Sequence, residues 1–373
     1  MKKSFILLIL FLFGAISLSA NKKYCNSVTE LQRATSIYLD LGNTNEKKFA
    51  KSLMVGLKNN FLPHERVQIF TINPEDSSIN LIFNSCAPKL TQQEIKKVKS
   101  EGTMKYMLGG NPIDTAKEDM SFFMASIKST LIKVYKNNVA NNYDSKALIE
   151  MLYNESSNFE DNPMQRVVLY SDMLQNSSEI KLDSIFKDGI AQKISEEYKT
   201  NFNFAEFYIF TAKKQFGISK YNKLSKFWKE YFELNKAYVV SFNDNLKLPK
   251  IKALGYKKYE GKLLLSGKSY ESQIFINYTS KLNTSNSWFI INEIDAIPLV
   301  GKVKYSKGKL ISANLKIGKI NGDYHTMFAG DEKFKLKFKG KKLIGVLKID
   351  NAEIILNGEV IKDPTFKIDM KEI

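Results

Sequence analysis

The stretch ATSIYLDLGNTNEKKFA, residues 34–50, changes character halfway along its length. Residues 34–40 are β-branched and apolar and end at an aspartate, which is typical of a buried β-strand. From Asn45 to Phe61, apolar residues recur at positions 49, 53, 54 and 57, which is the spacing of one helix face. A strand that leads through a short polar loop into a helix predicts the first unit of an α/β sheet.

The same alternation continues to about residue 243. We expect further strands at 66–71, 78–84, 166–170, 205–211 and 237–242, and further helices at 114–134, 145–153, 182–198 and 220–235. Strands separated by helices predict parallel pairing with helices on both faces, whereas the turn at 73–76 predicts one antiparallel hairpin at the edge. The sequence therefore predicts an α/β doubly wound, mostly parallel sheet over residues 21–245.

The chain changes again after residue 245. Residues 260–373 contain short alternating runs broken by Gly, Asn and Asp, with no helical period. This pattern predicts an antiparallel all-β domain, either a β-sandwich or a barrel-like meander. The segment 246–259, which contains Pro249, is expected to be the linker between the two domains.

The first twenty residues predict export. Lys2 and Lys3 precede an apolar run at 5–13, and small residues at 17–20 follow as a cleavage site. The run is shorter than the roughly 20 residues that a membrane-spanning helix needs, so a cleaved signal peptide is favoured over an anchor. We expect a periplasmic, secreted or cell-surface protein, in which the two cysteines, Cys25 and Cys86, form one disulfide.

The charged residues exclude some classes of function. The net charge is +17, yet only three residues are arginine, and proteins that recognise nucleic-acid sequence depend on the planar arginine fork. Nucleic acid is therefore not an expected partner. The two histidines, His64 and His325, lie in no zinc-binding motif, so a catalytic zinc site is not expected either.

Oxygen-bearing side chains are expected to gather at the carboxyl ends of the strands, where open α/β sheets bind ligands. Asp40 and Thr44 belong to the loop after the first strand, and Asp172 follows a later strand. Ser145 comes just before a predicted helix. Two carboxylates and two hydroxyls form a hard ligand set suited to Mg²⁺, Ca²⁺ or Mn²⁺.

This arrangement resembles a von Willebrand factor A-type (VWA) domain over roughly residues 34–243. The resemblance implies a metal-ion-dependent adhesion site in which Asp40 and Thr44 match the first and last ligands of the loop and Asp172 matches the final aspartate. Ser145 takes the place of a family threonine, whereas Gly42 stands where the family has a hydroxyl. The resemblance implies recognition of a protein partner, whose acidic side chain completes the shell of the divalent ion.

Two enzymatic interpretations compete for the same loop. The run from Asp40 to Thr44 is also similar to the phosphate loop of type III pantothenate kinases, but there a second strand follows rather than a helix. Asp40 would be the nucleophile in a haloacid-dehalogenase-like phosphatase, but Gly42 stands where that chemistry needs a second aspartate. A phosphoryl-transfer or phosphatase enzyme using Asp40 is the alternative to a non-enzymatic binding or assembly protein.

The run KFKLKFK, residues 333–339, alternates lysines with apolar residues. A period of two places Lys335, Lys337 and Lys339 on one face of a sheet and the apolar side chains on the other. This face is either a solvated surface that keeps the sheet soluble or a binding surface for an anionic envelope polymer, a lipid headgroup or an acidic protein.

Overall fold

The structure is a computed structural model with two compact units, residues 1–250 and 251–373. It describes residues 24–25, 33–40, 46–58, 60–73, 78–102, 106, 110–137, 146–159, 165–202, 205–211, 217–235, 237–248, 253–279, 287–291, 295–306, 309–317, 319–320, 323–324, 331–356 and 358–373. The predicted signal peptide at residues 1–20 lies outside these ranges. Each unit is described separately below.

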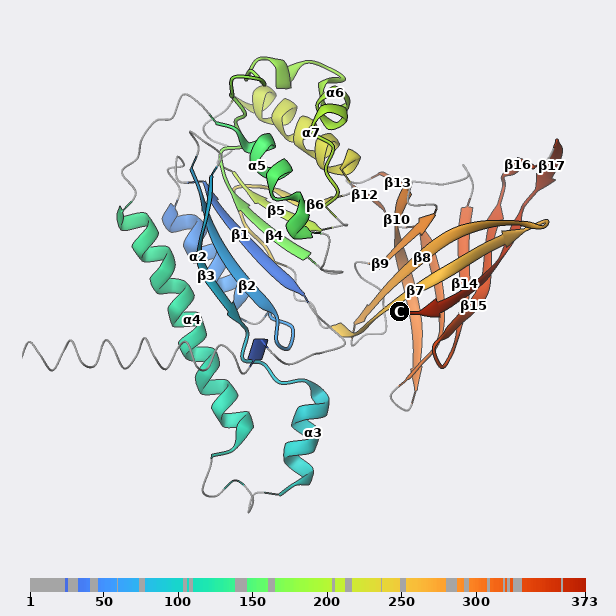
Figure 1. Ribbon diagram of the computed structural model, residues 1–373, viewed down its shortest axis with the longest axis horizontal. Helices are drawn as coiled ribbons and strands as arrows, with labels where there is room; N and C mark the ends of the chain where they lie inside the picture. The colour runs from blue at the N-terminus through green and yellow to red at the C-terminus, as the bar shows by residue number, and fades with distance from the viewer. Residues whose placement is uncertain are drawn as a thin grey trace, which may run out of the picture. The chain divides into compact units, whose positions relative to one another are not determined.

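The first unit contains a six-stranded sheet in the order β3-β2-β1-β4-β5-β6 (Figure 1). The strands are β1 Ala34–Asp40, β2 Arg66–Ile72, β3 Ile79–Cys86, β4 Gln165–Tyr170, β5 Glu206–Phe210 and β6 Tyr238–Asn243. All neighbouring pairs are parallel except β2 and β3, which form the antiparallel edge. The predicted doubly wound, mostly parallel sheet is thus confirmed.

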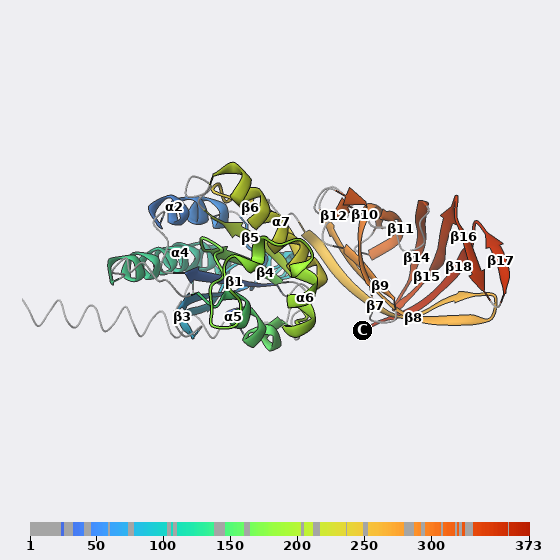
Figure 2. The same ribbon diagram turned by 90° about the horizontal axis from the view of Figure 1, so that it is seen from above.

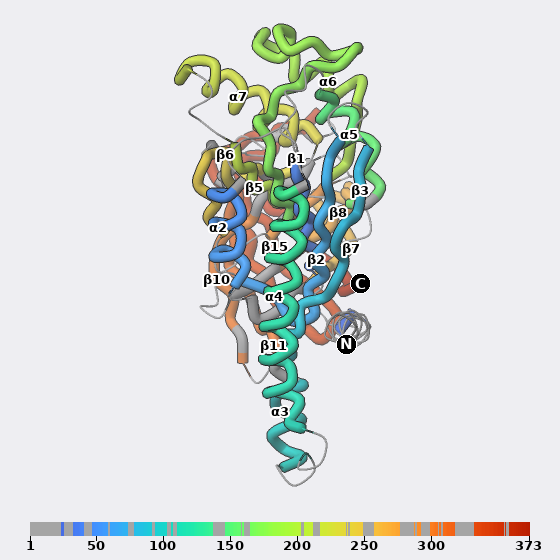
Figure 3. The backbone as a smooth tube through the Cα atoms, turned by 90° about the vertical axis from the view of Figure 1, so that its left-hand side faces the viewer, coloured from blue at the N-terminus to red at the C-terminus, as the bar shows by residue number. Residues whose placement is uncertain are grey.

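Helices cover both faces of this sheet. One face is covered by α2 Glu46–Leu57 and α4 Pro112–Asn137, and the other by α5 Leu148–Asn154, α6 Ile190–Glu197 and α7 Ile218–Leu234. Helix α3 Gln92–Ser100 contacts α4. Successive side chains of a strand point to opposite faces, so Ile37 and Leu39 pack with α2 and α4, whereas Tyr38 packs with α5, α6 and α7. Helices α2 and α4 lie side by side on their face (Figure 3). All seven residues of β1 are therefore buried.

The second unit is a closed antiparallel barrel in the order β10-β11-β14-β15-β18-β7-β8-β9 (Figure 2). Its strands are β7 Ala253–Leu265, β8 Lys268–Thr279, β9 Ser287–Ile291, β10 Asp295–Ser306, β11 Lys309–Ile317, β14 Asp331–Lys339, β15 Lys342–Asp350 and β18 Thr365–Glu372. Two short hairpins add β12 Lys319–Ile320 with β13 Asp323–Tyr324, and β16 Glu353–Leu356 with β17 Glu359–Lys362.

Strict alternation builds the barrel core. Buried residues alternate with exposed ones along β18, and the inward side chains of the eight strands form one apolar cluster. A Cβ atom at Gly301 or Gly345 would collide with the backbone of the neighbouring strand, so glycine permits the close approach there.

The all-β domain is confirmed. Of the two expected forms, the β-sandwich and the barrel, the structure has the barrel, because the last strand, β18, pairs with the first, β7, and closes the sheet. Strand β7 begins at Ala253, inside the segment expected to be the linker.

The predicted disulfide between Cys25 and Cys86 is present and links the N-terminal segment to the end of β3. Within the described ranges, no helix combines the length and the apolar character needed to cross a membrane.

Candidate functional site at the carboxyl edge of the sheet

Strand β1 lies between β2 and β4, which is the point where the strand order of the sheet reverses. Asp40 is the last residue of β1, and Ser171 and Asp172 directly follow β4. The two strands are parallel, so these residues come together at the same edge. The structure thus brings two of the four predicted ligands, Asp40 and Asp172, to one place.

A lysine lies between the two carboxylates. The Lys146 Nζ atom is 3.1 Å from Asp40 Oδ2 and 2.6 Å from Asp172 Oδ2. Ser171 Oγ donates a further hydrogen bond of 2.7 Å to Asp40 Oδ2. The Asp40 side chain is 1% exposed, that of Lys146 7% and that of Asp172 13%. We call these four residues the strand-end cluster.

The loop after β4 fixes the position of Asp172. Asp172 Oδ1 accepts from the Leu174 backbone N–H at 2.9 Å, and Ser171 Oγ accepts from the Met173 N–H at 2.9 Å. Met173 is buried and has a φ of 62°, a left-handed conformation that costs a non-glycine residue about 1–2 kcal/mol. The Met173 carbonyl accepts from Trp228 Nε1 at 2.8 Å. Hydrogen bonds within the turn and from Trp228 of α7 therefore hold the loop after β4 in this conformation.

The backbone of Lys146 is held just as firmly. Lys146 and Asn176 exchange two backbone hydrogen bonds of 2.8 Å, forming an isolated antiparallel bridge. Gln175 Oε1 then accepts from the Ile149 N–H at 3.0 Å, at the start of α5. The lysine is therefore placed beside the sheet edge by backbone bonds to the segment that also carries Asp172.

The electrostatics of the cluster are asymmetric. Burial opposes the charge on Lys146, but Asp40 and Asp172 outweigh it and raise the pKa of Lys146. Burial is the largest influence on Asp172, and with the nearby charge of Asp40 it raises the pKa of Asp172 despite the ion pair to Lys146. One ammonium thus faces two carboxylates, and Asp172 is the carboxylate whose ionisation is disfavoured.

Sequence reasoning did not find Lys146, although it adjoins the predicted ligand Ser145. Thr44 and Ser145 lie outside the described residues, so their part in the site stays a prediction. Across the described ranges, no group of three or more His, Cys, Asp or Glu side chains is arranged to hold a metal ion. Asp40 and Asp172 do not fit a divalent ion while the ammonium lies between them, because it takes the position that a shared cation would need.

A second buried charge cluster lies at the amino-terminal ends of the parallel strands, opposite the strand-end cluster. Glu65 Oε2 accepts from Arg33 Nη2 at 2.6 Å, and Glu65 Oε1 accepts from Arg166 Nη2 at 2.8 Å and from Thr35 Oγ1. Both guanidinium groups also donate to the Asn60 carbonyl. We call Arg33, Glu65 and Arg166 the strand-start cluster; it contains two of the three arginines of the chain.

Charges control the ionisation of this cluster. Burial alone would raise the pKa of Glu65, but Arg33 and Arg166 together hold that pKa below its usual range. Burial and the neighbouring Arg33 lower the pKa of Arg166 to about 10, so the Arg166 guanidinium stays charged at neutral pH. The cluster is a charged group of the core and offers no open face to a ligand, since Arg33, Glu65 and Arg166 are all buried.

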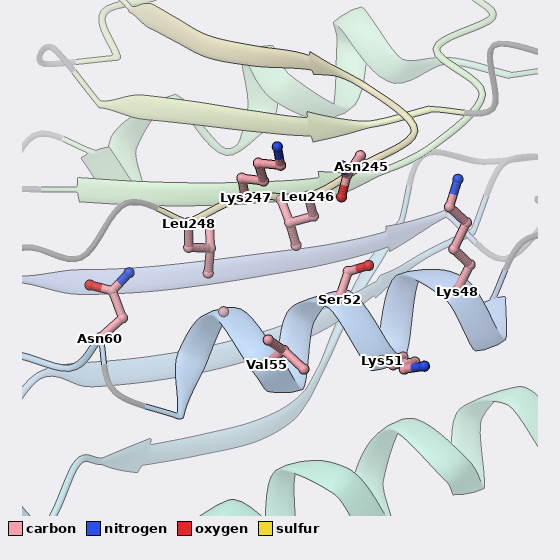
Figure 4. Close-up of a pocket in the computed structure, with 10 residues that line it drawn as sticks. Lys48, Lys51, Ser52, Val55, Asn60, Asn245, Leu246, Lys247 and Leu248 are labelled. Atoms are coloured by element: carbon pink, nitrogen blue, oxygen red, sulfur yellow. The ribbon is translucent and has the colours of Figure 1, made fainter.

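A surface groove of about 530 Å³ lies between α2 and the segment after β6 (Figure 4). The residues lining it include Lys48, Lys51 and Lys247 and no carboxylate. Lys48 also pairs with Asp244 at 2.8 Å. Asp40 and Asp172 do not line this groove, so it is separate from the strand-end cluster.

The remaining predicted site residues belong to the barrel. Lys335, Lys337 and Lys339 are exposed on β14, whereas Phe334 and Leu336, which alternate with them, are buried. Of the two histidines, His64 belongs to the first unit. Its Nε2 atom lies 3.0 Å from Glu94 Oε2, and it belongs to no group of three or more potential metal ligands among the described residues. His325 lies outside the described residues.

No protein-family profile and no curated protein matches the sequence. Among solved structures, the chain is similar to proximal thread matrix protein 1 from the mussel byssus, at 9% identity and a TM-score of 0.27. The match covers 55% of this chain and 46% of that chain, so it spans less than half of the mussel protein. A likeness of this size carries no argument about function.

Proposed function

We propose that the protein is an exported, non-enzymatic binding or assembly protein whose first unit is a VWA-like domain. The support for a VWA-like domain is the sheet with one antiparallel edge, together with a helix that closely follows β1. The observation that carries the proposal is the strand-end cluster, since Asp40 and Asp172 meet at the switch point where that family recognises its partners. The disulfide is compatible with export.

The strand-end cluster favours recognition of a protein partner without a divalent ion. In the adhesion site of the family, a metal ion balances the carboxylates, whereas here the Lys146 ammonium supplies the positive charge between Asp40 and Asp172. For Mg²⁺, Ca²⁺ or Mn²⁺ to bind as the resemblance implies, the ion would have to displace a buried lysine that two carboxylates hold. A partner would instead contact the rim formed by the cluster and its loops.

Thermal melting with and without 10 mM Mg²⁺, Ca²⁺ or Mn²⁺ tests this proposal. We expect no shift for the wild type, but a rise of about 2–4 °C for Lys146→Ala, because the vacated space then admits a cation. The rise should vanish in Lys146→Ala/Asp40→Ala. A wild-type stabilisation that Asp40→Ala abolishes would instead establish metal-dependent recognition. The absence of any shift in Lys146→Ala would show that the lysine does not stand in for an ion.

The enzymatic alternative requires a substrate to reach Asp40. That carboxylate is 1% exposed, and its Oδ2 atom already accepts from Lys146 and Ser171. A nucleophilic carboxylate needs an open approach to phosphorus, which this burial opposes. Phosphatase assays with p-nitrophenyl phosphate and Mg²⁺ provide the check: turnover that Asp40→Asn abolishes would make the protein an enzyme.

A further inference from the structure

Seven lysines share the outer face of three neighbouring barrel strands. Strand β10 contributes two, β11 one and β14 four: Lys302, Lys304, Lys316, Lys333, Lys335, Lys337 and Lys339. All seven are exposed, and the residues between them point into the apolar core. We call this set the lysine face.

The strand register shows how closely these charges gather. Asn314 of β11 lies opposite Lys302 on one side and opposite Lys335 on the other, and Ser312 likewise separates Lys304 from Lys337. Between them stand only small polar side chains. The ammonium groups of β10 and β14 therefore face a shared polar strip rather than compensating carboxylates.

Lysines of this face form three direct cross-strand pairs with other lysines. Lys316 and Lys348 both lie opposite Lys333, and Lys339 lies opposite Lys342 at the turn into β15. Like charges placed directly opposite each other destabilise a sheet. Solubility alone does not require such pairs, because mixed charges on an outer face serve that purpose as well.

Few of the described side chains of this region are acidic. Among the described side chains of β10, β11 and β14, the only carboxylate is that of Glu332, which is buried. Asp350 at the end of β15 pairs with Lys333 and Lys348, but the other six lysines of the face form no ion pair with a described residue. Elsewhere on the barrel, lysines form ion pairs with acidic residues: Lys257 pairs with Glu372, and Lys262 with Glu271.

From this segregation of charge we infer that the lysine face binds a flexible, linear polyanion carrying phosphate or carboxylate groups along its chain. Alternate residues of a strand lie about 7 Å apart. An extended polymer whose charges have a similar spacing can therefore place one charge beside each ammonium group along β14. The barrel contains no arginine, and lysine acts as a point charge rather than a planar fork. Recognition therefore depends on charge density.

The curvature of the surface favours a polymer over a lipid bilayer. The three strands belong to a closed barrel, so their outer face is convex. A flat membrane would contact only a narrow line of such a face, whereas a flexible chain follows its curve. This inference names the partner class of the proposed binding protein and rests on that function, but its residues lie in the other unit from the strand-end cluster.

Fluorescence anisotropy of the full mature chain with labelled polyphosphate and labelled poly-glutamate tests the inference. The test variant is Lys335→Gln/Lys337→Gln/Lys339→Gln, and the matched control is Lys96→Gln/Lys97→Gln/Lys99→Gln on α3, which removes the same charge from three exposed lysines. We expect at least one polymer to bind the wild type. The test variant should bind about tenfold more weakly, with a shallower salt dependence between 50 and 150 mM NaCl, and the control should bind within about twofold of the wild type.

Three results would overturn the inference. They are no binding of either polymer by the wild type, an equal loss in both triple variants, or binding to phosphatidylglycerol vesicles but to neither polymer. The melting temperature guards against misfolding: because the substitution removes like-charge repulsion, the test variant should melt no lower than the wild type.

The two proposals can fail separately. Lys146→Ala should bind the polymer as the wild type does, because the strand-end cluster takes no part in this binding. Release of orthophosphate from polyphosphate, if Asp40→Asn abolished it, would refute the non-enzymatic function while leaving the binding surface intact. If the wild type bound neither polymer, only the inference about the lysine face would be refuted, and the proposed function of the strand-end cluster would be unaffected.

Discussion

The two ends of strands β1 and β4 carry opposite arrangements of buried charge. At the start of the strands, the guanidiniums of Arg33 and Arg166 flank one carboxylate, that of Glu65. At their end, the carboxylates of Asp40 and Asp172 flank one ammonium, that of Lys146. The same pair of strands thus carries a group of three charged side chains with a net positive charge at the amino-terminal ends and one with a net negative charge at the carboxyl ends.

The difference lies in exposure and backbone geometry. The side chains of Arg33 and Arg166 are at most 2% exposed and that of Glu65 is fully buried, whereas Asp172 is 13% exposed. The left-handed backbone of Met173 stands beside Asp172, and strained backbone of this kind gathers at functional sites. We therefore expect the strand-start cluster to serve stability, and we propose the strand-end cluster as the place where a partner reaches the sheet.

The largest expected effect comes from breaking the strand-start cluster. Glu65→Gln leaves two buried guanidiniums without their counter-charge, so the free energy of unfolding should fall by about 3–5 kcal/mol. Urea unfolding measures this through Trp228, which is buried in the first unit, in a Trp288→Phe background that removes the other tryptophan of the chain.

Asp188→Asn is the matched control for this prediction. It also converts a carboxylate to an amide within an ion pair, but the Asp188 side chain is 100% exposed at 3.4 Å from Lys226. A change below about 0.5 kcal/mol is expected there. If the free energy of unfolding fell by similar amounts in Glu65→Gln and Asp188→Asn, burial would not be the reason that the strand-start cluster stabilises the fold.

Acid should reveal the same cluster. The folded-state pKa of Glu65 is below its unfolded value, near 4.5, because of Arg33 and Arg166. The folded state therefore binds the proton less readily, so this stabilisation is present above about pH 4.5 and is lost as the pH falls through the folded-state pKa. As the pH is lowered from 7 to 3, the free energy of unfolding should fall more steeply for the wild type than for Glu65→Gln. Parallel pH profiles would contradict this account.

The contrast between the clusters also shows what sequence reasoning can reach. Periodicity placed Asp40 and Asp172 at strand ends, and parallel pairing then placed them at one edge, because both inferences need only local patterns and one topological rule. Lys146 was missed because its role depends on the backbone bridge to Asn176, a contact between segments that no local pattern encodes. The ion pairs of Arg33 and Arg166 with Glu65 likewise join residues far apart in the chain, so no local pattern indicates them.

The barrel teaches a related lesson. The alternation in residues 333–339 indicated which side chains point outward, but the register that places Lys316 opposite Lys333 depends on pairing between β11 and β14, which are not consecutive strands. Closure of the barrel is likewise a long-range event, because it joins the last strand, β18, to the first, β7, so the sequence left sandwich and barrel open. Local periodicity determines faces, whereas neighbours across strands require the fold.

The smallest effect should separate the two carboxylates of the strand-end cluster. Asp40→Asn should lower the free energy of unfolding by about 1–2 kcal/mol, because the buried carboxylate accepts charge-assisted bonds from Lys146. Asp172→Asn should cost less than about 1 kcal/mol. Burial and Asp40 already disfavour its ionised form, and the amide oxygen can still accept from the Leu174 N–H.

Urea unfolding followed by Trp228 suits this comparison, since the indole bonds to the Met173 carbonyl next to Asp172. If Asp172→Asn lowered the free energy of unfolding as much as Asp40→Asn or more, both carboxylates would be needed to hold Lys146 in position. The expected inequality would instead mean that Asp40 alone retains the lysine. The more exposed Asp172 carboxylate would then be the member of the cluster that can exchange its bond to Lys146 for a bond to a partner without cost to the fold.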